Sequence, residues 1–127
     1  MILPGNESHT LPIINYDEMK GTVHIKGRST SPDAQQYFNE FLPYLRECTQ
    51  KRPTDFHVTM ELEYFSTRTA KILMDFFKII ITEIVGFGYN AEVDWIVEQG
   101  DEDMLETAND YQYLTQLKFN IIEKPEY

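Results

Sequence analysis

Alternating apolar and polar residues predict three β-strands in this chain. The alternation covers residues 22–26, 57–65 and 92–98, and it places the apolar side chains of each segment on one face. In the second segment, the residues that share this face are Val58, Met60, Leu62 and Tyr64. Two shorter apolar segments, residues 11–14 and 119–123, predict two further strands.

Apolar residues spaced three and four positions apart predict three amphipathic helices. The first begins at Ser31 and Pro32, where a capping hydroxyl precedes a proline, and it ends before Pro53. Pro43 removes a backbone amide inside this helix, so we expect a kink there or two shorter helices. The other two helices cover about residues 67–86 and 101–115. The former is the more apolar of the two and should be the most buried helix.

The order of these elements, β-β-α-β-α-β-α-β, predicts a two-layer α/β fold with a largely parallel mixed sheet. Strands covered on both faces would be continuously apolar. The alternating strands here have a polar side, which includes Glu61, Glu63, Glu92 and Asp94, so the helices should cover one face only. Pro12 cannot donate a hydrogen bond to a neighbouring strand, and we therefore expect the segment 11–14 at the sheet edge.

The length and the charge of the chain exclude several classes of protein. Its 127 residues suit one domain, which we place at residues 11–127 after a flexible N-terminus at residues 1–10. With 21 acidic and 11 basic residues the net charge is -10, so a nucleic acid would be repelled. The most apolar stretch, residues 72–85, is too short and too charged to span a membrane. No signal peptide is predicted and Cys48 is the single cysteine, so we expect a cytoplasmic protein without membrane insertion.

No pattern in the sequence predicts a metal, a cofactor or a catalytic site. His9, His24 and His57 lack the spacing of metal ligands. Gly86 and Gly88 follow a helix rather than precede one, so they predict a helix end and not a phosphate-binding loop. We therefore expect a protein that is not an enzyme and that binds neither a cofactor nor a metal.

Two groups of acidic residues leave an alternative open. The first group lies at the start of the third predicted helix and consists of Asp101, Glu102, Asp103 and Glu106. It could bind a divalent cation, but carboxylates in a first helical turn also stabilise the helix, and Asp103 and Glu106 have capping-box spacing. Glu61 and Glu63 could form an acid–base pair, although a solvated strand face explains them as well. A small hydrolase that uses the acidic residues is a less favoured alternative.

A short segment that joins the strand at residues 57–65 to the most apolar helix carries more information. Its hydroxyl residues are Ser66, Thr67 and Thr69. Hydroxyl groups are ordinary caps for a helix N-terminus. The same place suits a phosphate, because a phosphoryl group on Thr67 would lie near free backbone amides, with Arg68 and Lys71 close enough to pair with it.

Three motifs carry a family resemblance. They are Gly27-Arg28-Ser29 followed by Pro32-Asp33-Ala34 and Phe38, then Leu62-Glu63-Tyr64-Phe65-Ser66-Thr67, and finally Trp95 with Asp101-Glu102-Asp103-Met104. With them the chain resembles, from Leu11 onward, the SiaC-type bacterial regulatory phosphoproteins, which are similar in topology to the anti-sigma-factor antagonists of the STAS fold. In that family the second motif reads Tyr-Phe-Asn-Thr-Ser-Ser. Ser66 and Arg68 replace its asparagine and its first serine.

The resemblance implies roles for particular residues. Thr67 falls on the phosphoacceptor, with Ser66 and Thr69 as alternative acceptors. The residues expected to contact a partner or the phosphate are Arg28, Ser29, Tyr64, Phe65, Arg68 and Lys71. Arg28 could equally form a salt bridge within the protein.

The resemblance also implies three partners: a Ser/Thr protein kinase, a PP2C-type phosphatase and a diguanylate cyclase. The unphosphorylated form would bind and activate the cyclase and so control cyclic di-GMP and biofilm formation. A phosphate near Glu61 and Glu63 would release this partner by like-charge repulsion. The alternative is a protein-interaction module of the same fold that works without phosphorylation.

Overall fold

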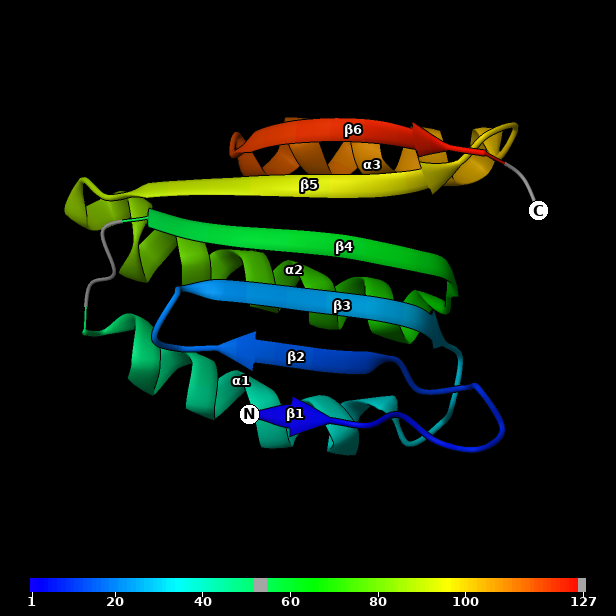
Figure 1. Ribbon diagram of the computed structural model, residues 1–127, viewed down its shortest axis with the longest axis horizontal. Helices are drawn as coiled ribbons and strands as arrows, with labels where there is room; N and C mark the ends of the chain where they lie inside the picture. Colours follow the sequence, from blue (N-terminus) through cyan, green and yellow to red (C-terminus); the bar gives the residue numbers. More distant parts are fainter. Residues whose placement is uncertain (52–54, 126–127) are drawn as a thin grey trace.

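One mixed sheet organises the computed structural model, which describes residues 1–51 and 55–125 (Figure 1). Within these residues the sheet has six strands, which lie side by side in the order in which they follow along the chain. The strands are β1 (Ile2–Leu3), β2 (Ile13–Asp17), β3 (Thr22–Ser29), β4 (Asp55–Phe65), β5 (Asn90–Glu98) and β6 (Lys118–Lys124). β1, β2 and β3 pair antiparallel, whereas β3, β4, β5 and β6 pair parallel.

The helices all lie on one face of this sheet, as Figure 1 shows. They are α1 (Ala34–Thr49), α2 (Thr67–Glu83), the short 3₁₀-helix η1 (Val85–Phe87) and α3 (Glu102–Thr115). The apolar faces of strands and helices meet between the two layers, and the other face of the sheet carries many polar side chains together with the exposed Ile13 and Ile122. This arrangement confirms the predicted two-layer α/β fold. None of the described helices is both long enough and apolar enough to cross a membrane.

Aromatic side chains fill the core between the layers. Trp95 of β5 is fully buried, and its ring stacks on Tyr111 of α3 with centroids 5.4 Å apart and on Phe119 of β6 at 6.1 Å. Phe77 of α2 packs against the same rings. Such ring pairs add to the stabilisation that comes from burying apolar area. The cluster therefore fixes α2 and α3 against the parallel part of the sheet.

The N-terminal part of the sheet differs from our expectation. β1 was not predicted, and it pairs with the outer side of β2, so the strand near Pro12 is not the edge strand. The amino group of Met1 donates to the carbonyl of Tyr16 at 2.9 Å, and Tyr16 N donates to Met1 O at the same distance. The antiparallel pairing is satisfied because Pro12 precedes β2 rather than lying within it. A strand of two residues was too short for its pattern to be recognised.

The helix boundaries also differ in part. α1 begins at Ala34, and its N-cap is Asp33 rather than Ser31. Ser31 Oγ accepts a hydrogen bond from Asp33 N at 3.0 Å in the turn that precedes the helix. The helix then continues through Pro43, so the alternative of two shorter helices was wrong. It ends at Thr49, before Pro53, which itself lies outside the described residues. α2 ends at Glu83, and η1 follows it with Gly88 as its left-handed cap at φ +85°.

Candidate functional site

The turn between β4 and α2 carries the three hydroxyl residues that the sequence singled out, and the structure gives them different environments. Ser66 is the N-cap of α2, and its Oγ accepts a hydrogen bond from Thr69 N at 3.3 Å. Thr67 is the first residue of the helix and is exposed. Its hydroxyl is not needed as the cap of α2, since Ser66 has that role. Thr67 is thus the accessible member of the three.

Ser29 and Thr69 form a buried connection between β3 and α2. Both side chains are fully buried, and their hydroxyl oxygens lie 2.7 Å apart. Thr69 Oγ1 also donates to the carbonyl of Ser29 at 3.1 Å, and Ser66 N donates to that same carbonyl at 2.9 Å. Buried hydroxyls are stable only when they are hydrogen-bonded, as these are. Neither Ser29 nor Thr69 presents its side chain to a partner in this conformation.

A β-bulge at the end of β4 exposes Tyr64. Gly27 pairs with Leu62, but Arg28 pairs with Tyr64, so Glu63 is an additional residue in β4. The bulge shifts the alternation by one position, and Tyr64 becomes 62% exposed. Our prediction that Tyr64 shares the buried face of Leu62 was therefore wrong.

Phe65 takes the inward position instead of Tyr64. Its ring packs against Trp95 with centroids 6.4 Å apart and against Tyr111 at 6.5 Å. Phe65 is half-buried, and it attaches the end of β4 to the aromatic core. By this packing Phe65 fixes the position of the backbone between Tyr64 and Thr67.

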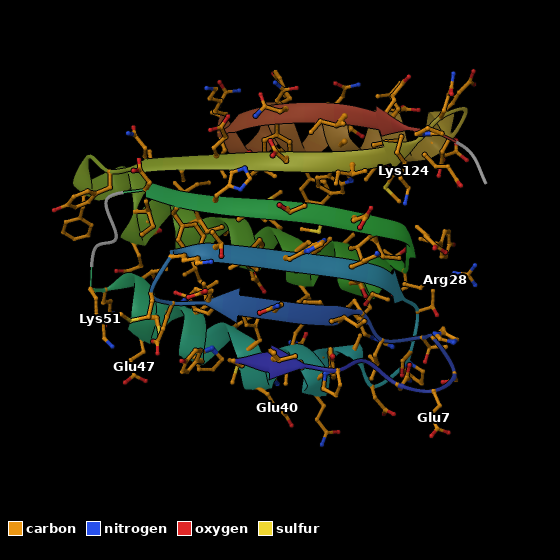
Figure 2. The ribbon with its side chains drawn as sticks, in the orientation of Figure 1. Glu7, Arg28, Glu40, Glu47, Lys51 and Lys124 are labelled. Atoms are coloured by element: carbon orange, nitrogen blue, oxygen red, sulfur yellow. The ribbon has the colours of Figure 1, made fainter. Side chains whose placement is uncertain are left out.

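The three basic residues that are expected to contact a partner or the phosphate lie around the turn. Arg28 Nε donates to Glu63 Oε2 at 2.9 Å, which is the salt bridge within the protein that the sequence left open. Arg68 Nη1 donates to the carbonyl of Pro32 at 3.3 Å, and Lys71 is exposed on the next turn of α2. Figure 2 shows Arg28 at the edge of the sheet where β4 continues into α2. The structure thus brings positive charge to the same edge as Thr67.

The open face of the sheet carries an ion-pair network that the sequence did not predict. Glu61 is only 15% exposed, and its carboxylate lies 3.3 Å from Lys124 Nζ, 3.7 Å from Lys26 Nζ and 3.6 Å from His24 Nε2. Burial alone would raise the pKa of Glu61, but the hydrogen bond from Lys124 and the positive charges of Lys124, Lys26 and His24 outweigh it. The pKa of Glu61 is therefore below its ordinary value. Figure 2 shows Lys124 at the β6 end of this network.

Polar side chains of β4, β5 and β6 also contact one another on this face. His57 Nε2 lies 3.0 Å from Asp94 Oδ2, and Asn120 Nδ2 donates to Glu92 at 2.6 Å and to Asp94 at 2.8 Å. The hydrogen bond from Asn120 lowers the pKa of Glu92, and Lys118 adds to this effect at 3.4 Å. The side chains that form these ion pairs and hydrogen bonds are far apart in sequence. Their contacts therefore become apparent only from the order and register of the strands.

The acidic residues at the start of α3 have a structural role. Asp101 is the N-cap, and its Oδ1 accepts a hydrogen bond from Met104 N at 3.0 Å. The cap is therefore Asp101, and the expected capping box between Asp103 and Glu106 was wrong. In residues 1–51 and 55–125, no three His, Cys, Asp or Glu side chains are close enough together to hold a metal ion.

A shallow hollow lies beside Arg28 and Tyr64. Its volume is about 450 Å³, and it is lined by Ser8, His9, Thr10, Arg28, Thr30, Glu63, Tyr64 and Glu98. Arginine and tyrosine are the residue types that most often anchor protein–protein interfaces. An exposed hydroxyl, an exposed aromatic ring and an exposed ion pair on one edge suit the binding of a protein.

The sequence matches the family model of the SiaC family regulatory phosphoproteins over residues 5–124. The chain belongs to the SiaC family. This match covers the β4–α2 turn, the bulge and the whole parallel part of the sheet. No curated protein matches the chain.

Solved structures of the SiaC family have the same fold. Apo-SiaC from Pseudomonas aeruginosa superposes with a TM-score of 0.85 at 17% identity, over 96% of this chain and 97% of that chain. The structure of the Pseudomonas aeruginosa diguanylate cyclase SiaD in complex with its activator SiaC gives a TM-score of 0.89 at 18% identity, over 98% and 99%. A further structure of SiaC of Pseudomonas aeruginosa gives 0.82 at 16% identity, over 99% and 98%. At these identities the likeness shows the fold.

Proposed function

We propose that this protein is a non-enzymatic, cytoplasmic regulator that is reversibly phosphorylated on Thr67, and whose unphosphorylated form binds and activates a diguanylate cyclase. Membership of the SiaC family of regulatory phosphoproteins supports this function. The complex of SiaD with its activator SiaC supports the choice of partner, because a chain in it shares the fold over 98% of this protein. The observation that carries the proposal is the exposure of Thr67 at the start of α2, beside Tyr64.

The modification needs two enzymes. A Ser/Thr protein kinase transfers the terminal phosphoryl group of ATP to Oγ1 of Thr67, so that a new P–O bond forms, ADP leaves and the hydroxyl proton is released. A PP2C-type phosphatase reverses the step with water and releases inorganic phosphate. Thr67 is the acceptor rather than its neighbours, because Thr69 is fully buried and Ser66 is committed to capping α2.

The physical effect of the phosphate is electrostatic. It adds about -1.5 to -2 charges at an edge that already carries Glu63. A partner docked over Tyr64 would have to desolvate this charge or accept its repulsion. Arg68 and Lys71 reduce the repulsion only partly, since both are exposed. The phosphorylated form is therefore the one that releases the cyclase, which lowers cyclic di-GMP and biofilm formation.

Kinase labelling tests this proposal. The protein is incubated with ATP and a cognate Ser/Thr protein kinase, and the phosphate is located by peptide mass mapping. We expect one phosphate, on Thr67, and none on the Thr67→Ala protein. Ser66→Ala is the matched control, since it loses the helix cap but keeps the acceptor and should still be labelled. Equal labelling of the Thr67→Ala protein would contradict the proposal.

A phosphorylation-independent interaction module is the second candidate. The exposure of Tyr64 favours it, because the aromatic ring and the Arg28–Glu63 pair form a docking edge without any modification. Binding of the unmodified and the stoichiometrically phosphorylated protein to the cyclase separates the two candidates. We expect phosphorylation to weaken binding by at least tenfold. Equal affinities of both forms would support the second candidate instead.

A further inference from the structure

The Arg28–Glu63 ion pair lies next to the proposed phosphorylation site. The carbonyl of Ser29, which follows Arg28, accepts a hydrogen bond from the backbone N of Ser66, which precedes Thr67, at 2.9 Å. Arg28 is thus the neighbour of Ser29, Thr67 is the neighbour of Ser66, and the backbones of Ser29 and Ser66 are hydrogen-bonded to each other. Arg28 and Thr67 therefore lie at the same end of the β3–β4 pair, which is the edge at which Figure 2 shows the Arg28 side chain.

The ion pair is also weak enough for Arg28 to change its partner. The side chains of Arg28 and Glu63 are each 57% exposed, so water competes for both charges and their attraction contributes little to stability. A phosphothreonine carries more charge than a carboxylate and offers three strong acceptor oxygens. A guanidinium group can donate to two phosphate oxygens at once, whereas Arg28 donates only through Nε to Glu63. Arg28 should therefore bind a phosphate more strongly than it binds the Glu63 carboxylate.

The other basic residues of the turn are less suited to this role. Arg68 donates to the carbonyl of Pro32, and as the immediate neighbour of Thr67 on a helix it points in a different direction. Lys71 lies four residues after Thr67 and faces the same side of α2, so it is the competitor that an experiment must separate from Arg28.

We infer that phosphorylation of Thr67 moves the Arg28 guanidinium from Glu63 to the phosphate. We call the Arg28–Glu63 pair the latch, and it is closed when the two side chains are paired and open when Arg28 binds the phosphate. The inference rests on the proposed function, since it assumes that Thr67 is the acceptor. When the latch opens, Glu63 loses its partner at the bulge that exposes Tyr64. One modification then changes two charges on the docking edge, the phosphate itself and the carboxylate released beside Tyr64.

The second ionisation of the phosphate reports its neighbours. Phosphothreonine is installed at position 67 by genetic-code expansion, so that the experiment does not depend on a kinase, and its ³¹P signal is followed against pH. The free group ionises near pH 6, and a bound guanidinium lowers this pKa. We expect the pKa of the phosphate to be lower by roughly 1 unit in the protein with Arg28 than in the Arg28→Gln variant.

Three matched variants control this comparison. Arg68→Gln and Lys71→Gln should each move the ³¹P titration less than Arg28→Gln does. His9 lines the same hollow as Arg28, so the comparison is repeated with His9→Asn, which should keep the difference. Circular dichroism confirms that the Arg28→Gln variant is folded.

The outcomes separate this inference from the proposed function. An identical phosphate pKa with and without Arg28 overturns the latch, and a larger shift for Lys71→Gln assigns the phosphate to Lys71 and overturns it as well. If the kinase does not label Thr67, the proposed function is wrong even where the ³¹P titration shows the contact with Arg28. If the kinase labels Thr67 and Arg28→Gln changes nothing, only the latch is wrong.

Discussion

At the scale of single residues, burial separates side chains of identical chemistry. Ser66, Thr67 and Thr69 are three hydroxyl residues within four positions, yet one caps a helix, one is exposed and one is fully buried. The same holds for Glu61 and Glu63 on one strand. Glu61 is 15% exposed and lies beside Lys124, Lys26 and His24, whereas Glu63 makes an exposed pair with Arg28. The residue type determines the chemistry available to a side chain, and its burial and contacts determine whether it caps a helix, stabilises the core or is accessible to a partner.

The lowered pKa of Glu61 predicts a pH-dependent stability. A carboxyl group whose pKa is depressed in the folded state stabilises the protein above its ordinary value of 4.5, and this contribution is lost as the pH falls through the folded pKa. We expect Glu61→Gln to lower the free energy of unfolding at neutral pH. The difference from the wild type should shrink as the pH falls from about 5 to about 3.

Urea unfolding at a series of pH values measures this difference. Glu63→Gln is the matched control, because its carboxylate is on the same strand but 57% exposed, and it should change the free energy of unfolding far less. A difference between wild type and Glu61→Gln that stays constant over the whole range would contradict the prediction.

At the scale of elements, the bulge between β3 and β4 decides which side chains form the docking edge. The alternation of β4 reads correctly from Val58 to Leu62 and then shifts by one residue at Glu63. Gly27 lies at this point with φ +120°, a conformation that L side chains rarely adopt. A local pattern predicts a regular strand and contains no signal for an inserted residue, which depends on the register of the neighbouring strand.

Replacing Gly27 tests the role of the bulge. Gly27→Ala should lower the free energy of unfolding by roughly 1–3 kcal/mol, because the backbone would be strained. Steric contact is not the reason, since the nearest atom to an added Cβ is Pro12 Cα at an ordinary 3.7 Å. We also expect Tyr64 to become less accessible, which chemical nitration of tyrosines measures.

Gly100→Ala is the control for this prediction, because Gly100 has φ +92° in open space and lies outside the bulge. That variant should lose stability without any change in the nitration of Tyr64. An unchanged accessibility of Tyr64 in a destabilised Gly27→Ala protein would show that the bulge does not depend on the glycine.

At the scale of the whole molecule, the parallel strands bring the ends of β3 and β4 to one edge, and the helical layer supports that edge from behind (Figure 1). Tyr111 of α3 is part of this support. Its hydroxyl donates to the carbonyl of Ala70 in the first turns of α2 at 2.7 Å, and burial raises the pKa of Tyr111 to about 12. The turn that carries Thr67 is thus connected to α3 as well as to β3.

Removing this hydroxyl should loosen the start of α2. We expect Tyr111→Phe to lower the free energy of unfolding by about 1 kcal/mol and to speed amide hydrogen exchange in the first turns of α2. Tyr113→Phe is the matched control, since Tyr113 is on the same helix but 76% exposed, and it should have no measurable effect. Equal exchange rates in both variants would show that the hydrogen bond does not support the turn.

The sequence by itself determined the order of the five longer strands and the three α-helices, the buried face of these elements up to the bulge in β4, the family, and the segment with the three hydroxyls. These features depend on the period of apolar residues and on short motifs, both of which are local properties of the chain. Only the tertiary structure decided that Thr67 is exposed while Thr69 is buried, that Tyr64 points outward, and that Glu61 lies beside Lys124, Lys26 and His24. These features depend on strand register and on contacts between distant segments, and no local pattern encodes them.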